Sequence, residues 1–171
     1  PSYRLDDIGH SEVGTNKISY DGTLNDLYEN DLENYQKARK ASVLLYIYEY
    51  KDALYLTLIK RTTYDGPHSG QISFPGGKPV SLDSSLWDTA KREFKEELGV
   101  DLLSASPFLT LSRVYIPPSN FLVTPFVAVV KKKPFFKLDP REVALQINIS
   151  LDELIHLKIN GLTTIPVLKV P

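Results

Sequence analysis

The 171-residue sequence contains no cysteine. This absence excludes disulfide bonds and cysteine-ligated zinc sites, and it fits a reducing compartment. The sequence also has no run of 18 apolar residues, which a membrane-spanning helix would need, and no recognisable signal peptide. We therefore expect a cytoplasmic protein without a membrane partner.

The sequence also lacks an excess of charge of either sign. Its 20 lysines and arginines nearly balance 21 aspartates and glutamates, for a net charge of −1. A protein that binds nucleic acid through its backbone phosphates is usually strongly basic, so we expect no nucleic-acid partner. The longest basic run, 131–133, is interpreted as a solvated strand end.

The chain is long enough for one domain with a buried core. Apolar residues at helical spacing over 24–40 predict a helix, so residues 1–40 are interpreted as an N-terminal extension and helix, and 41–171 as the main domain. Apolar and β-branched residues predict strands over 42–50 and 53–61, joined by a hairpin turn at Lys51 and Asp52.

The second half of the chain adds one long helix and several strands. A cap at Asp83, Ser84 or Ser85 predicts a helix that runs to Leu98 and stops at Gly99. The remaining pattern predicts strands over 72–74, 107–116, 121–131 and 143–149, and a short helix over 151–157. The expected class is α+β, an α/β/α sandwich with a mixed central sheet, and a further C-terminal element is expected after residue 171.

Three glutamates on the long helix are the main chemical signal. Glu93, Glu96 and Glu97 are spaced i, i+3 and i+4, so their carboxylates project from one helix face. Like charges this close repel each other, and a hard cation such as Mg²⁺ would relieve the repulsion. The alternative is a solvated acidic face. Two neighbouring features favour the metal site: glycines at 76–77, whose backbone can approach a ligand closely, and Arg92, which can orient a carboxylate.

Residues 77–100 resemble the Nudix box, whose pattern is G-x5-E-x7-R-E-U-x-E-E-x-G-U with U apolar. The matching residues are Arg92, Glu93, Phe94, Glu96, Glu97, Gly99 and Val100. The segment from Gly77 to Arg92 is one residue longer than the pattern, and Asp83 or Ser84 stands near the position of its early glutamate.

The resemblance implies a metal-dependent diphosphatase. Glu93, Glu96 and Glu97 would hold Mg²⁺ or Mn²⁺ with the carbonyl of Gly77, and Arg92 would orient the acids. Glu93 as a metal ligand and Glu93 as the general base both remain open. The predicted catalytic set is Arg92, Glu93, Glu96 and Glu97.

The preceding segment, 58–77, is similar to the signature of coenzyme A diphosphatases, L-L-T-x-R-[SA]-x3-R-x3-G-x3-F-P-G-G. Arg61, Gly70 and Phe74 fit this spacing, whereas Gly66 stands in place of the second arginine. The implied substrate is coenzyme A or acyl-coenzyme A, cleaved to adenosine 3′,5′-bisphosphate and (acyl-)4′-phosphopantetheine. The alternatives are a Nudix diphosphatase for ADP-ribose, NADH or another nucleoside diphosphate derivative, and a non-catalytic nucleotide-binding Nudix module.

Four residues outside the acidic helix are candidates for substrate binding. Arg61 would clamp a phosphate, or else be a charge at a strand end. His68 and Gly76 precede the helix, and Glu142 lies in a predicted loop, where a glutamate outside the box assists in several Nudix enzymes. The expected partner is a small nucleoside diphosphate substrate, and a homodimer is considered as the assembly.

Overall fold

The computed structural model describes residues 35–63, 65, 69–103, 106–116 and 119–156. Pro1–Gln36 and Lys37–Pro171 form two separate compact units, and in the first only Tyr35 and Gln36 are described, both helical. Most of the helix predicted over 24–40 therefore lies outside the described residues. Its predicted end is wrong, because Arg39 and Lys40 already belong to a strand, where they pair with Phe121 and Leu122.

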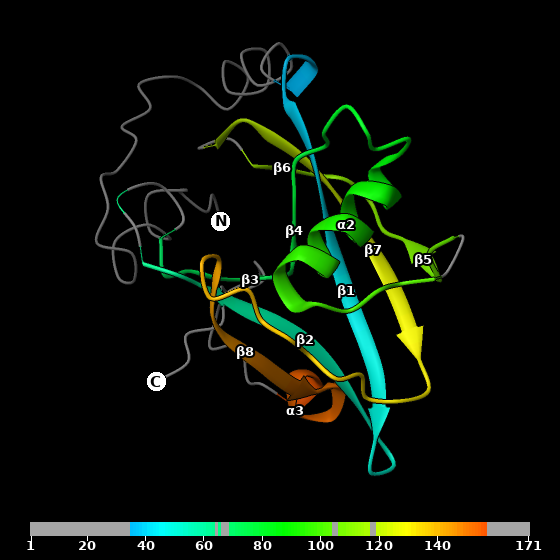
Figure 1. The fold of residues 1–171 in the computed structure, drawn as a ribbon. Coiled ribbons are helices and arrows are strands. Elements are labelled where there is room, and N and C mark those ends of the chain that lie inside the picture. The colour runs from blue at the N-terminus through cyan, green and yellow to red at the C-terminus, as the bar shows by residue number, and fades with distance from the viewer. Residues whose placement is uncertain (1–34, 64, 66–68, 104–105, 117–118, 157–171) are drawn as a thin grey trace, which may run out of the picture. The chain divides into compact units, whose positions relative to one another are not determined.

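The second unit is built on a mixed sheet of eight strands in the order β3-β2-β1-β7-β5 (Figure 1). β4 also pairs with β1, β6 with β7, and β8 with β2. β1 and β7 are parallel, and the other pairs are antiparallel. The elements are β1 Arg39–Tyr50, β2 Ala53–Arg61, β3 Ile72–Ser73, β4 Gly76–Gly77, α2 Leu86–Leu98, β5 Leu109–Thr110, β6 Val114–Ile116, β7 Phe121–Val130, β8 Val143–Ser150 and α3 Leu151–His156.

The predicted hairpin between β1 and β2 is confirmed. Lys51 and Asp52 form its two-residue turn, with φ values of 50° and 59°. Positive φ at both central residues is the mark of a type I′ turn, whose twist matches that of the flanking strands. The turn therefore sets the register, in which Tyr46 pairs with Thr57 and Tyr50 with Ala53.

Beyond this register β1 and β2 separate, and the segment 72–77 fills the gap. β3 pairs with the end of β2, and β4 pairs with Ser42 and Val43 near the start of β1. The Leu44 N–H donates to the carbonyl of Pro75 at 2.8 Å, and the Arg61 N–H donates to that of Gln71 at 2.9 Å. This insertion brings Gly76 and Arg61 to the same carboxylate, since each contacts one oxygen of Glu97.

Helix α2 follows the predicted capping signals. Ser85 is its N-cap and accepts a hydrogen bond from the Asp88 N–H at 3.1 Å, while Gly99 ends it in the left-handed region at φ 69°. The predicted apolar edge of the helix is buried against β1 and β7. It comprises Trp87, Ala90, Phe94 and Leu98. The ring of Phe94 lies 4.6 Å from that of Tyr46, so α2 is fixed over the middle of β1.

One predicted strand is divided in the structure. The prediction over 107–116 is wrong in continuity, because β5 and β6 are two short strands, both paired with β7. Between the pairs Thr110–Phe126 and Val114–Val123, four residue steps on one side face three on the other. The extra residue interrupts the ladder as a β-bulge does.

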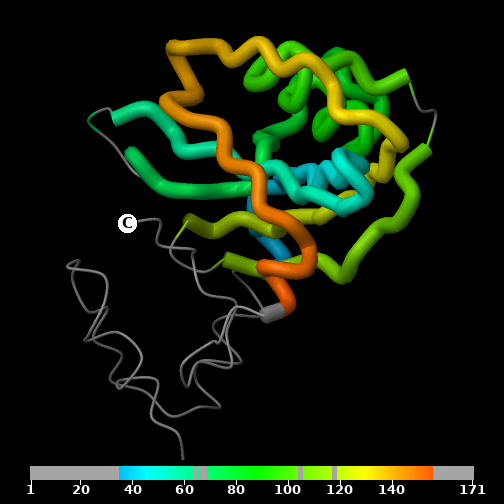
Figure 2. The backbone as a smooth tube through the Cα atoms, turned by 90° about the horizontal axis from the view of Figure 1, so that it is seen from below, coloured from blue at the N-terminus to red at the C-terminus, as the bar shows by residue number. Residues whose placement is uncertain are grey.

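The predicted α+β fold with a mixed sheet is confirmed. Figure 2 shows α2 on one side of the sheet, while α3 follows β8 on the other side. The predicted last strand and short helix correspond to β8 and α3, although Leu157 lies outside the described residues. Among the helices that the structure describes, none is long and apolar enough to cross a membrane.

Candidate active site

The three glutamates of α2 lie along one side of the helix but differ in exposure. The side chain of Glu97 is 1% exposed, that of Glu93 is 16% exposed, and that of Glu96 is 53% exposed. The helix therefore presents a graded row of acids, from a buried carboxylate next to β4 to a solvated one. The solvated-face interpretation holds only for Glu96.

Glu97 is the buried end of this row. Its Oε2 accepts the Gly76 backbone N–H at 2.9 Å, and its Oε1 lies 3.6 Å from Arg61 Nη1. Oε1 has no hydrogen-bond partner among the described residues. Burial raises the pKa of Glu97 to about 8, although the Gly76 N–H and Arg61 oppose the shift, and the charges of Glu93 and Glu142 add to it.

Glu93 lies against the second glycine of β4. A Cβ atom at Gly77 would come within 2.5 Å of the Glu93 carboxylate, so only a glycine leaves room for it in this position. Burial raises the pKa of Glu93, and the neighbouring Arg92 guanidinium opposes this shift. The predicted proximity of Gly77 to the acids is thus present in the structure.

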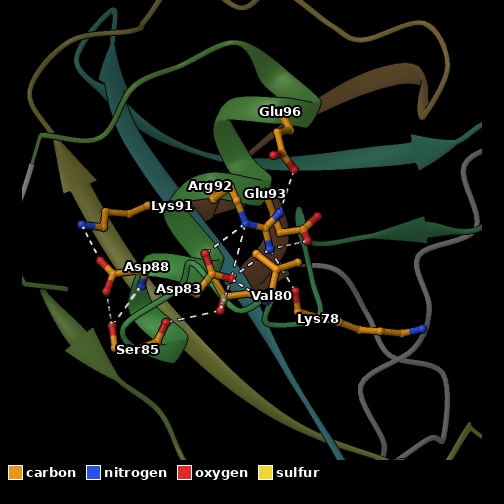
Figure 3. Close-up of polar contacts among 10 residues, drawn as sticks. Lys78, Val80, Asp83, Ser85, Asp88, Lys91, Arg92, Glu93 and Glu96 are labelled. Atoms are coloured by element: carbon orange, nitrogen blue, oxygen red, sulfur yellow. Dashed lines mark hydrogen bonds and ion pairs between the residues drawn. The ribbon is translucent and has the colours of Figure 1, made fainter.

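Arg92 is the centre of a polar network that joins the loop to the helix (Figure 3). Its Nε and Nη2 atoms donate to the two oxygens of Asp83, each at 3.0 Å. Nη2 also donates to the Lys78 carbonyl at 2.9 Å and lies 3.0 Å from Glu93 Oε1. Nη1 donates to Glu96 at 2.8 Å. The predicted contact of Arg92 with the acids is present, and it involves Glu93 and Glu96.

Asp83 is a member of this network that the sequence signals only weakly. Its Oδ2 also accepts the Val80 N–H at 3.0 Å and the Thr89 hydroxyl at 2.9 Å. The hydrogen bonds from Arg92 lower the pKa of Asp83 to about 2. The sequence offered Asp83 as a candidate helix cap and as a residue near the position of the early glutamate of the Nudix box.

The carboxylates of α2 are of the chemical kind that binds a hard cation, but they are not arranged around one point. Glu97 Oε1 is a buried carboxylate oxygen that accepts no hydrogen bond from the described residues, and the pKa of the neighbouring Glu93 carboxyl is also raised. A cation would stabilise both carboxylates. Across the described ranges, however, no three His, Asp or Glu side chains are gathered closely enough to hold a metal ion. Glu93 and Glu96 instead contact Arg92, so the three-glutamate ligand set remains a prediction.

The other predicted residues are placed unevenly. Arg61 reaches the site, and the charge of Glu142 raises the pKa of both Glu93 and Glu97 although its own side chain is exposed. His68 and Gly66 lie outside the described residues. Ser73 was not predicted from the sequence. Its buried hydroxyl has no hydrogen-bond partner among the described residues, and the same is true of the Nε atom of Arg61. Ser73 pairs with Ile59, two residues before Arg61 on the same sheet face, so the two side chains are diagonal neighbours.

The fold and this acidic helix are those of the NUDIX domain family, whose sequence model matches residues 38–163. The chain belongs to this family. Among its relatives, an uncharacterized Nudix hydrolase NudL of Yersinia enterocolitica is 38% identical over 102 residues, which is 60% of this chain and 52% of the relative. Nudix hydrolase 15, mitochondrial, of Arabidopsis thaliana is 36% identical over 48% of this chain and 31% of its own length. The chain thus spans about half or less of these two relatives.

Solved structures share the fold at low sequence identity. The NUDIX domain of Shewanella oneidensis NrtR, in complex with ADP ribose, superposes with a TM-score of 0.57 at 16% identity, covering 78% of this chain and 87% of that one. A C. elegans Ap4A hydrolase superposes with a TM-score of 0.53 at 19% identity, covering 68% and 83%. At these identities the likeness establishes the fold alone.

Proposed function

We propose that this chain is a divalent-metal-dependent hydrolase that cleaves the diphosphate of a nucleoside diphosphate derivative, with coenzyme A or acyl-coenzyme A as its substrate. One observation carries the proposal. The buried carboxylate of Glu97 has an oxygen, Oε1, that accepts no hydrogen bond from the described residues and lies 3.6 Å from Arg61 Nη1. The Arg61 ion pair is too long for a hydrogen bond, so this buried carboxylate oxygen keeps its hydrogen-bonding capacity for a ligand.

The residues divide the work by charge. Arg61 neutralises and orients a phosphate of the substrate, since its guanidinium forms strong hydrogen bonds with phosphate oxygens. Glu93, Glu96 and Glu97 would hold Mg²⁺ or Mn²⁺ with the carbonyl of Gly77, and the bound ion would supply charge neutralisation and a more acidic water. Asp83 holds Arg92 in place by an ion pair. Arg92 in turn forms ion pairs with Glu93 and Glu96 and so orients their carboxylates.

The chemical step is attack of a water oxygen on one phosphorus of the diphosphate. The new P–O bond forms as the bridging P–O bond breaks, and the bridging oxygen leaves with the second phosphate. A carboxylate takes the proton that the water loses. Glu93 and Glu97 are both candidates for this base, because both have raised pKa values and lie against β4. Their titrations are coupled by their mutual charge.

The choice of coenzyme A rests on the segment before the helix. Arg61, Gly70 and Phe74 follow the coenzyme A diphosphatase signature, and the match continues at 119–127. Gly66 in place of an arginine is the specific observation that favours the second candidate, a diphosphatase for ADP-ribose, NADH or another nucleoside diphosphate derivative. A cytoplasmic location, a homodimer and the lack of nucleic-acid and membrane partners also remain predictions.

A substrate panel tests the proposal. Coenzyme A, ADP-ribose, NADH and diadenosine polyphosphates are each incubated with Mg²⁺ or Mn²⁺, and the products are separated by chromatography. We expect coenzyme A to be cleaved most efficiently, to adenosine 3′,5′-bisphosphate and 4′-phosphopantetheine. Glu97→Gln is the control that should lose turnover while retaining the fold. A higher kcat/KM for ADP-ribose or NADH would favour the second candidate, and no turnover of any compound would favour a binding module.

A further inference from the structure

A groove of about 560 Å³ lies at the far end of the sheet from the acidic helix face. Residues 49–52 of the β1–β2 hairpin form one wall, and residues 131–135, which follow β7, form the other. Figure 1 shows the hairpin at the lower end of β1, whereas β4 pairs near the opposite end. Seven residues of extended strand separate Val43 from Tyr50, which is about 23 Å at roughly 3.3 Å per residue. The groove is therefore separate from the candidate active site.

The groove is positively charged. Four lysines line it: Lys51, Lys131, Lys132 and Lys133. Within the described part of the chain, no carboxylate forms an ion pair with any of these ammonium groups, although Glu49 and Asp52 also belong to the walls. Lys51 and Lys133 instead lie over the ring of Tyr50, at 5.4 Å and 4.9 Å from its centroid. Lysines from two segments that are distant in the sequence thus converge on one groove.

Two aromatic rings complete the surface. Tyr50 is 41% exposed, and Phe135 is 87% exposed although the next residue, Phe136, packs against Tyr46 and Tyr48 in the core. An aromatic ring this exposed offers a free face for stacking, and planar bases stack on such faces. Lysine ammonium groups are binding partners of phosphates. The two features together match a ligand that is both planar and multiply phosphorylated.

We propose that this groove is a second ligand site, which binds a nucleotide through its phosphates and its base. The lysines hold the phosphate chain, and the ring of Phe135 stacks on the base. The groove is shallow and open to solvent, and its volume is in the range of small-ligand sites.

Isothermal titration of the full chain with ATP, in the presence of EDTA to prevent hydrolysis, tests the proposal. Lys131→Glu/Lys133→Glu should weaken ATP binding about tenfold or more, because each change replaces an attraction by a repulsion. The matched variant Lys40→Glu/Lys60→Glu changes the net charge equally but lies outside the groove, and it should bind like the wild type. Phe135→Ala should weaken the binding of ATP but not that of tripolyphosphate, which has no base.

The outcomes distinguish the groove from the active site. Arg61→Ala should retain the part of ATP binding that the lysine variant loses, whereas loss of all binding in Arg61→Ala with retention in the lysine variant would overturn the proposal. Equal binding of ATP by the wild type and the lysine variant would also overturn it. Tripolyphosphate binding as tight as that of ATP, with no effect of Phe135→Ala, would refute recognition of the base. Turnover of the panel substrates is independent of these results, so the proposed function stands or fails separately.

Discussion

The Glu93 carboxylate occupies the space that a side chain at Gly77 would need. A Cβ atom there would come within 2.5 Å of Glu93 Oε1. The atoms that it meets are the far end of a flexible side chain, so Glu93 can move aside without a change in the backbone. The absence of a side chain at Gly77 therefore serves the position of a carboxylate more than the stability of the fold.

Gly77→Ala should accordingly lower activity more than stability. We expect turnover to fall about tenfold or more as Glu93 is displaced, with little change in the thermal midpoint. The matched variant is Gly76→Ala, where φ is 149° and a Cβ atom would overlap the backbone carbonyl oxygen of Ser42. That variant should lower the midpoint strongly. Thermal unfolding and kcat of both proteins check the contrast, which equal loss of stability in the two variants would contradict.

The buried carboxyl of Glu97 should make the metal-free protein less stable as the pH rises. The unfolded chain releases this proton near the ordinary pKa of 4.5, whereas the folded protein retains it up to about 8. Between these values the folded state binds more protons, so the free energy of unfolding falls with increasing pH. Glu97→Gln removes this contribution. Denaturant unfolding in EDTA at pH about 5 and about 8 measures the free energy of unfolding, which should decrease less in the variant than in the wild type. An equal decrease in both proteins would show that Glu97 ionises normally.

Asp83→Asn should disturb the acids through Arg92. The wild-type carboxylate binds Nε and Nη2, and the amide can accept from only one of them well. We expect roughly tenfold lower kcat and a loss of about 1–3 kcal/mol in the free energy of unfolding. The wild type should lose this contribution as the pH falls from about 4 to about 2, because the folded pKa of Asp83 is lowered to about 2. Asp88→Asn, in the first turn of the same helix, should leave kcat unchanged.

Arg61→Ala should weaken substrate binding. We expect KM to rise about tenfold or more, since a charge-assisted phosphate contact is lost. The pH profile should also shift upward, because Arg61 lowers the pKa of Glu97. The control is Lys60→Ala, in which the adjacent, exposed side chain points to the other face of the sheet. A KM that changes equally in both variants would remove Arg61 from the site.

Ser73→Ala should separate binding from folding. The buried hydroxyl makes no hydrogen bond to the described residues, so its removal should leave the thermal midpoint unchanged or slightly raised. If the hydroxyl binds substrate beside Arg61, KM should increase several-fold. Thr124→Val is the matched variant, because Thr124 Oγ1 is also buried and neither accepts nor donates a hydrogen bond among the described residues, but lies on β7. An unchanged KM for Ser73→Ala would assign it no role.

Local signals in the sequence predicted the elements well where the structure depends on neighbouring residues. Ser85 and Gly99 delimit α2 by capping, and Lys51 and Asp52 turn the hairpin. Predictions failed where distant segments decide the outcome. Arg39 and Lys40 are strand residues because they pair with β7, and the bulge between β5 and β6 arises from the same long-range pairing.

The sequence by itself determined the family, the helix and the side of it that carries Glu93, Glu96 and Glu97, because these depend on residue identity and helical period. Only the tertiary structure decided how the three glutamates differ in burial and in neighbouring charges. Glu97 is buried beside Gly76 and Arg61, Glu93 fills the space at Gly77, and Glu96 remains in solvent. Burial and charged neighbours set the pKa of a carboxyl, and both come from segments that spacing along one helix does not reveal.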